Sequence, residues 1–180
     1  MELEKLRLDS RLLPKVWKIY EAAFPEDEKR SEGTQAKVMR LPNYSIYAIS
    51  KDEEAIALLA VWEFENFVFI EHIAVKEHMR NSGFGTKILR GFLEPATKLV
   101  LCAIDLPKTA IAKRRLGFFT RCGFRLNEFD YIQPAYSTEK KPVQMKIMSC
   151  PGLLTPKDFE KAREEIHLKV YGCETPVTEI

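Results

Sequence analysis

The segment Phe69–Leu89, FIEHIAVKEHMRNSGFGTKIL, combines residue types that could bind an anion with types that could move a proton. An apolar stretch containing Glu71 and His72 leads to a turn with two glycines, and an amphipathic pattern follows. A helix that begins at such a turn has several unpaired backbone N–H groups and carries about half a positive charge there. Phosphate is the ligand that this arrangement favours.

The turn itself, Arg80-Asn81-Ser82-Gly83-Phe84-Gly85, has the pattern R-x-x-G-x-G. Its two glycines let the backbone bend sharply and approach a ligand closely. A dinucleotide-binding G-x-G-x-x-G needs a third glycine, but Ile88 stands at that place and no βαβ unit precedes the turn. A Walker loop is also absent. The pattern therefore predicts a phosphate site of another kind, with a plain tight turn as the alternative.

Glu71 and His72 are the two candidates for a base. Desolvation in an apolar strand raises the pKa of an acid unless the acid is paired, so Glu71 could accept a proton or form a structural ion pair. His72 has an ordinary pKa near neutrality, but a hydrogen-bonded core histidine is the simpler interpretation. Successive strand residues face opposite ways, so both enter one site only if a bulge reorients one of them.

The spacing of apolar residues predicts the elements that position these groups. The run Phe67–Lys76 is almost continuously apolar, which indicates a central strand covered on both faces. The expected strands are Leu3–Leu8, Tyr44–Ser50, Ala55–Glu63, Phe67–Lys76, Leu99–Ile104, Phe124–Ile132 and Val143–Met148, and the expected helices are Leu12–Ala23, Thr34–Met39, Thr86–Leu93, Pro107–Arg121 and Thr155–Tyr171.

Composition excludes several classes of protein. The net charge of +2, from 28 basic and 26 acidic residues, gives no basic surface for nucleic acid. Apolar runs are far shorter than the roughly 20 residues of a membrane helix. The four cysteines form no C-x-x-C pair, the three histidines have no zinc spacing with them, and the N-terminus has no apolar signal segment. We therefore expect a cytoplasmic protein with no metal, nucleic-acid or membrane partner.

The strand, the R-x-x-G-x-G turn and the following helix together resemble the acyl-CoA pyrophosphate loop of the GNAT superfamily of N-acyltransferases. Two other segments strengthen the resemblance. Arg115–Phe124, RLGFFTRCGF, is similar to the family's helix-to-strand segment, which commonly has tyrosine, three variable residues and Gly-Phe. Phe24–Arg30, FPEDEKR, resembles the acidic, arginine-ended segment of a bacterial GNAT subgroup.

This resemblance implies an α/β GNAT-like fold, a mixed central sheet of about seven strands flanked by helices. It extends over most of residues 1–150, which we expect to form the acetyltransferase domain. Residues 151–180 are expected to be a C-terminal helical extension packed on the same domain or on a partner subunit, so a homodimer stays open.

The resemblance also implies which residues bind acetyl-CoA. The backbone of Ile73, Ala74 and Val75 would pair with the pantetheine amides as an added strand and supply an oxyanion N–H. Arg115 would meet the 3'-phosphate, although a solvated helix face is the simpler explanation for it and its basic neighbours. The pyrophosphate would lie on Arg80, Asn81, Ser82, Gly83, Phe84, Gly85 and Thr86.

The chain departs from the family pattern at Phe119, which stands where a tyrosine commonly gives a proton to the leaving thiolate. Tyr136 and Tyr131 are the substitutes that the sequence offers, and aromatic residues at a sheet edge are the alternative. The acids Glu26, Asp27 and Glu28 could attract a cationic amine or simply lie on an exposed loop.

The function that follows from the resemblance is acetyl transfer from acetyl-CoA to a primary amine, directly within a ternary complex. Cys102 and Cys122 have no histidine partner that the sequence reveals, so a covalent acyl-enzyme is disfavoured. Phe119 motivates an alternative, an acyl-CoA-binding sensor with weak or no catalysis. A phosphate-binding module unrelated to CoA is a third possibility. The acceptor, a small-molecule or peptide amine, is not identified by the sequence.

Overall fold

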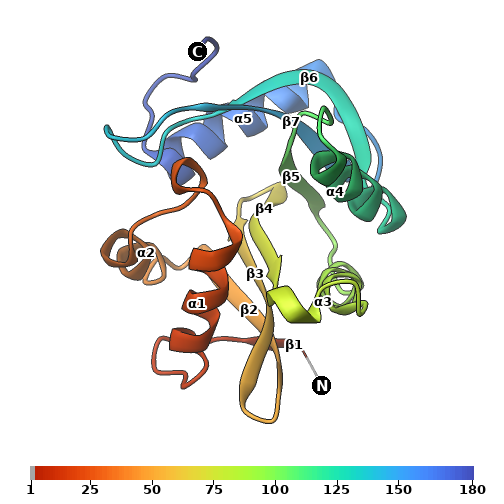
Figure 1. Ribbon diagram of the computed structural model, residues 1–180. Helices are drawn as coiled ribbons and strands as arrows, with labels where there is room; N and C mark the ends of the chain where they lie inside the picture. The colour runs from red at the N-terminus through yellow and green to blue at the C-terminus, as the bar shows by residue number, and fades with distance from the viewer. Residues whose placement is uncertain (1–2) are drawn as a thin grey trace.

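The computed structural model describes residues 3–180, and these form one seven-stranded sheet with helices on both faces (Figure 1). The strands are β1 (Leu3–Lys5), β2 (Tyr44–Lys51), β3 (Glu54–Glu63), β4 (Phe67–Val75), β5 (Leu99–Asp105), β6 (Arg125–Gln133) and β7 (Val143–Cys150). The α-helices are α1 (Leu13–Ala23), α2 (Glu32–Val38), α3 (Phe84–Leu93), α4 (Ala110–Arg121) and α5 (Pro156–Tyr171), and the 3-10 helices are η1 (Glu26–Glu28) and η2 (Glu77–Met79).

The strand order is β1-β2-β3-β4-β5-β7-β6, so β4 lies in the middle of the sheet as its apolar sequence predicts. Only β4 and β5 pair in parallel among the strands of residues 3–180; the other neighbours are antiparallel. The mixed sheet that the resemblance implies is therefore confirmed.

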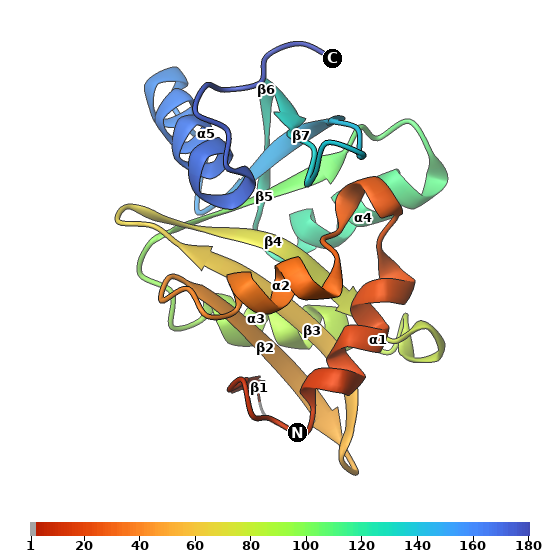
Figure 2. The ribbon, with the colours of Figure 1, turned by 90° about the vertical axis from the view of Figure 1, so that its left-hand side faces the viewer.

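Two helical layers cover the sheet. Figures 1 and 2 show α1 and α2 on one face of β2–β4 and α3 on the opposite face. The core on the first face also contains side chains of α5, including Phe159 and Ile166, so this helix packs on the sheet. The core on the second face contains Ile88 and Leu89 of α3 and Phe119 of α4. No helix within residues 3–180 is long and apolar enough to cross a membrane.

Local sequence explains where the elements begin and end. The β2–β3 hairpin turns at Asp52 and Glu53, whose φ angles of 50° and 61° match the turn that suits a twisted hairpin. The expected start of α4 at Pro107 is wrong, because the Thr109 side chain accepts a hydrogen bond from the Ala112 N–H at 3.1 Å and caps the helix. The first strand, β1, ends at Lys5 and is shorter than the predicted strand Leu3–Leu8.

A β-bulge interrupts β4 at Glu71. Ala60 of β3 pairs with His72, but its neighbour Val61 pairs with Ile70, so Glu71 is the extra residue. The side-chain pattern of β4 reverses at this point. Phe67, Phe69 and Ala74 belong to the core under α1 and α5, whereas Val68, Ile70, Ile73 and Val75 pack in the core under α3 and α4. The bulge therefore brings Glu71 and His72 to the same face of the sheet.

Candidate active site

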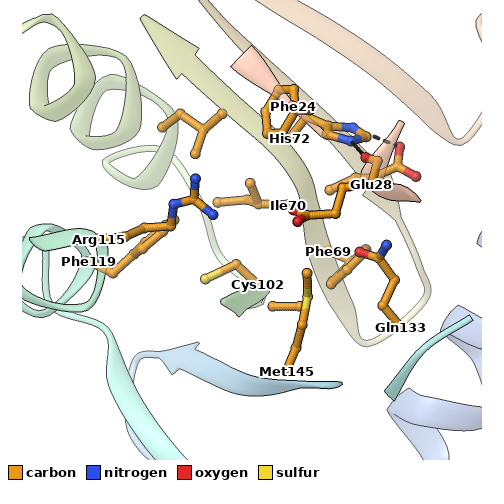
Figure 3. Close-up of a pocket in the computed structure, with 13 residues that line it drawn as sticks. Phe24, Glu28, Phe69, Ile70, His72, Cys102, Arg115, Phe119, Gln133 and Met145 are labelled. Atoms are coloured by element: carbon orange, nitrogen blue, oxygen red, sulfur yellow. Dashed lines mark hydrogen bonds and ion pairs between the residues drawn. The ribbon is translucent and has the colours of Figure 1, made fainter. Parts of the chain in front are cut away.

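The parallel strands β4 and β5 separate halfway along their length. Their pairing ends at Ile70 and Cys102, and beyond it Ile73–Val75 pairs with β3 alone. The other edge of this segment is open to an added strand-like ligand. A cavity fills the gap (Figure 3), and it is lined by Phe24, Glu28, Phe69, Ile70, Glu71, His72, Ile73, Cys102, Ala103, Arg115, Phe119, Gln133 and Met145.

The glycine turn ends at the start of α3. Gly83 has φ of 80° and precedes the helix, a conformation that side chains disfavour. The first helical hydrogen bond of α3 runs from Lys87 N to Gly83 O at 2.9 Å, which leaves the preceding amides of the turn available to an anion. Arg80 Nε donates to Val75 O at 3.3 Å and joins the turn to the end of β4.

Gly85 has a packing role as well. A Cβ at this position would lie 3.3 Å from Phe118 Cε2 and 3.6 Å from Val75 Cγ2. The absence of a side chain thus lets α3 approach α4 and the end of β4 closely. The remaining residues of the predicted phosphate turn are exposed or half-buried: Asn81, Ser82, Phe84 and Thr86.

Glu71 is enclosed by four side chains. Arg30 Nη1 lies 2.6 Å from Glu71 Oε1, and the Tyr136 hydroxyl donates to the same oxygen at 2.9 Å. Trp62 Nε1 donates to Oε2 at 3.0 Å, and His72 Nδ1 lies 3.6 Å from that oxygen. The Glu71 side chain is 1% exposed. Its two oxygens are therefore directed at protein groups.

These contacts correct the expectation of a raised pKa at Glu71. Burial alone would raise the pKa, but the charge of Arg30, the nearby His72 ring and the hydrogen bond from Trp62 outweigh it and lower the pKa to about 2. A carboxylate with so low a pKa is a weak proton acceptor at neutral pH. The geometry thus favours the structural ion pair over the catalytic base.

His72 is a buried ring with a backbone partner. Its Nε2 lies 2.9 Å from Glu28 O, within hydrogen-bond distance, and its side chain is 3% exposed. Tyr20 and Phe24 pack against the ring in T-shaped contacts, with centroids 4.8 Å and 4.5 Å away. This arrangement fits the hydrogen-bonded core histidine that the sequence offered as an alternative to a base.

Neither tyrosine proposed as an acid lines the cavity. The Tyr136 hydroxyl donates a hydrogen bond to Glu71, and burial together with the Glu71 charge raises the Tyr136 pKa. Tyr131 is fully buried in the core under α5. Phe119, which stands at the usual tyrosine position, does line the cavity and is 2% exposed. The phenyl ring leaves that wall of the cavity without a hydroxyl donor.

Arg115 faces the cavity, unlike its exposed neighbours Lys113 and Arg114. Its Nη1 lies 2.7 Å from Asp105 Oδ2, and both side chains are about one-third exposed. The structure thus places this guanidinium beside the gap between β4 and β5 and separates it from the solvated face of α4.

Sequence reasoning missed Arg30 as a site residue. It is 4% exposed, and its Nη2 donates to Val170 O at 2.8 Å while its guanidinium lies 4.5 Å from the centre of the Tyr136 ring. Arg30 therefore joins the segment before α2 to Glu71 and to α5. The FPEDEKR segment pointed to this region, but the buried charge pair depends on contacts distant in sequence.

The family comparison agrees with this geometry. A model of the acetyltransferase (GNAT) family matches residues 13–124, which include α1, the bulged strand, the glycine turn and α4. The chain belongs to the GNAT acetyltransferase family. Among the residues that the structure describes, no three metal-ligating side chains come together.

Solved structures of acetyltransferases share this fold. A GNAT-family acetyltransferase from Bacteroides thetaiotaomicron is 28% identical, with a TM-score of 0.89 over 96% of this chain and 99% of that one. A Bacillus subtilis acetyltransferase in complex with CoA is 18% identical, with a TM-score of 0.61 over 84% and 99% of the two chains. The likeness to the second protein is one of fold.

A curated relative matches a shorter stretch. The uncharacterized N-acetyltransferase YvbK of Bacillus subtilis (strain 168) is 33% identical over 64 residues. These residues make up 36% of this chain, and the match spans about two fifths, 41%, of the relative's length.

Proposed function

We propose that this protein transfers an acetyl group from acetyl-CoA to a primary amine, directly within a ternary complex. The observation that carries the proposal is the open edge of Ile73–Val75 beside the cavity, next to the glycine turn at the start of α3. An extended pantetheine would pair with that edge, and its pyrophosphate would meet the turn amides. The thioester would then lie in the cavity.

The residues present suit acetyl-CoA on chemical grounds. A cosubstrate with an anionic middle and an amide-bearing arm needs backbone donors in both places, and the turn and the open edge of β4 offer them. Bound acetyl-CoA supplies an activated acyl group. The backbone N–H groups near Ile73–Val75 would stabilise negative charge on the acyl oxygen, and Arg115 would add positive charge beside the cavity.

The proposal also covers the acceptor and the cellular location. We assign a small-molecule or peptide amine as acceptor, because the cavity has acidic and amide side chains at Glu28 and Gln133. All four cysteines are free thiols, which supports a reducing, cytoplasmic location. A homodimer is compatible with this function but is not needed for it.

The test combines binding with turnover. Calorimetry measures the acetyl-CoA affinity, and thiol release is followed against a panel of polyamines, amino acids, aminoglycosides and peptides. We expect wild type to bind acetyl-CoA and to acetylate at least one class. Gly83→Val should weaken acetyl-CoA binding by about tenfold or more, because the new side chain strains the turn and blocks the anion.

Gly172→Val is the matched control. Gly172 follows α5, has φ of 74°, and like Gly83 has no atom within 4 Å of the place that a Cβ would occupy, so the backbone strain is comparable. Its acetyl-CoA affinity should equal that of wild type. Unchanged affinity in a folded Gly83→Val variant would show that the turn is not the anion site. Tight acetyl-CoA binding with no transfer to any amine would instead support the sensor function suggested by Phe119.

A further inference from the structure

The cavity between β4 and β5 contains a carboxylate that the family comparison does not assign. Glu28 lies at the end of η1, and its side chain extends into the cavity on the side that Arg115 faces (Figure 3). In contrast to Glu71, Glu28 forms no ion pair within residues 3–180. Its carboxylate is therefore available to a ligand.

The backbone around Glu28 is fixed from several sides. Glu28 N donates to Pro25 O at 3.0 Å, and His72 Nε2 lies 2.9 Å from Glu28 O. Two residues later, Arg30 N donates to the Tyr20 hydroxyl at 2.8 Å. These contacts hold η1 against β4 and α1, so the carboxylate is presented by an ordered segment.

We propose that Glu28 is the catalytic residue that accepts a proton from the acceptor amine. The proposal rests on the acetyl transfer proposed above and identifies the acceptor as a cationic primary amine whose ammonium group enters the cavity. Glu71, held in its ion pair, acts as structural support for the same wall.

The reaction balances with these groups. The ammonium gives one proton to the Glu28 carboxylate, and the neutral amine nitrogen attacks the thioester carbonyl carbon to form a C–N bond. Collapse of the tetrahedral intermediate breaks the C–S bond. The thiolate takes the second proton lost by the nitrogen, and Glu28 then returns its proton to water. The products are the N-acetylamine and the CoA thiol.

The surroundings of Glu28 suit a proton acceptor. Burial raises its pKa, the Asp105 charge acts in the same direction, and Arg115 and His72 oppose it. The titratable groups around it are Asp27 of η1, Glu71 and His72 of β4, Cys102 and Asp105 of β5, and Arg115 of α4. A raised pKa brings a carboxylate closer to the amine in basicity, which improves proton transfer.

The test compares Glu28→Gln with Glu26→Gln. Glu26 lies on the same 3-10 helix, its side chain is 78% exposed and pairs with Lys29, and it does not line the cavity. With the best amine of the panel, Glu28→Gln should lower kcat/KM by about 100-fold or more near neutral pH. Glu26→Gln should stay within about threefold of wild type. Acetyl-CoA affinity should be unchanged in both variants, which also reports that they are folded.

The pH profile separates a base from a group that only positions the amine. The loss in Glu28→Gln should shrink towards about pH 10, where a free amine is largely neutral without help. Glu28→Asp should recover part of kcat. A loss that is the same at every pH, a rise in KM alone, or turnover within about threefold of wild type would overturn the role of Glu28 while acetyl transfer stands. A wild type that acetylates no amine would overturn both proposals.

Discussion

Two carboxylates that line the same cavity, Glu71 and Glu28, have contrasting surroundings. Glu71 pairs with Arg30 and accepts hydrogen bonds from Tyr136 and Trp62, and the Arg30 charge and the Trp62 N–H outweigh burial and lower its pKa to about 2. Glu28 has no such partner, and burial raises its pKa. Burial with a countercharge therefore yields a stabilising anion, and burial without one yields a group that can exchange a proton.

The largest effect should come from breaking the Arg30–Glu71 pair. Glu71→Gln leaves the Arg30 charge buried without a countercharge, and we expect the free energy of unfolding to fall by about 3–5 kcal/mol. Urea unfolding measures this change. Arg30→Met in the same chain removes the stranded charge and should restore part of the loss.

The Asp105–Arg115 pair provides the control for that experiment. Its atoms are equally close, at 2.7 Å, but both side chains are about one-third exposed. Asp105→Asn should therefore cost about 1 kcal/mol or less. Equal decreases in the free energy of unfolding for Glu71→Gln and Asp105→Asn would show that burial does not make the Arg30–Glu71 pair more important for stability.

The pH dependence of stability should separate the two acids by sign. The Glu71 pKa is lower in the folded protein than its ordinary value of 4.5, so its contribution is complete above about pH 4.5 and is lost as the pH falls towards about 2. Glu28, with a raised pKa, contributes a slope of the opposite sign. As the pH is lowered from about 4.5 towards about 2, the urea midpoint of wild type should decrease, and that of Glu71→Gln should decrease less steeply. Parallel pH curves for the two proteins would contradict the lowered pKa.

A smaller effect is expected at Tyr136, whose hydroxyl serves Glu71. Tyr136→Phe removes one hydrogen bond to a charged group and should lower the free energy of unfolding by about 2 kcal/mol. Turnover should stay within about threefold of wild type, because the hydroxyl does not line the cavity. A large fall in kcat without a change in stability would instead support Tyr136 as the acid for the leaving thiolate.

The order of elements could be predicted from the sequence because its signals are local. Apolar periodicity gives the strands and most helices, and proline and glycine mark their ends. The central position of β4 follows from its continuous apolar run. The start of α4 was missed because Pro107 is a weaker signal in this context than the Thr109 cap.

The candidate site was predicted less completely, because its key contacts are not local. When both faces of a strand are apolar, the sequence does not show where the alternation of side chains between the two faces is interrupted. The sequence therefore indicated a bulge only as the condition under which Glu71 and His72 could enter the same site. The partner of Glu71 comes from a separate loop, and its presence reverses the direction of the pKa shift. The residue types in the sequence identified both acids as candidates. Only the packing in the structure shows that Glu71 is enclosed by its partners and that Glu28 faces the cavity without an ion pair.

The extra residue at Glu71 also affects how this strand could change through insertions and deletions. Deleting Glu71 would leave every other side chain of β4 on its present face, since Val61 already pairs with Ile70 and its neighbour Ala60 with His72. An insertion or deletion elsewhere in the strand, with the bulge kept, would instead turn the side chains on one side of it towards the wrong core. The bulge is therefore the one position at which this strand can be shortened without exchanging its two faces.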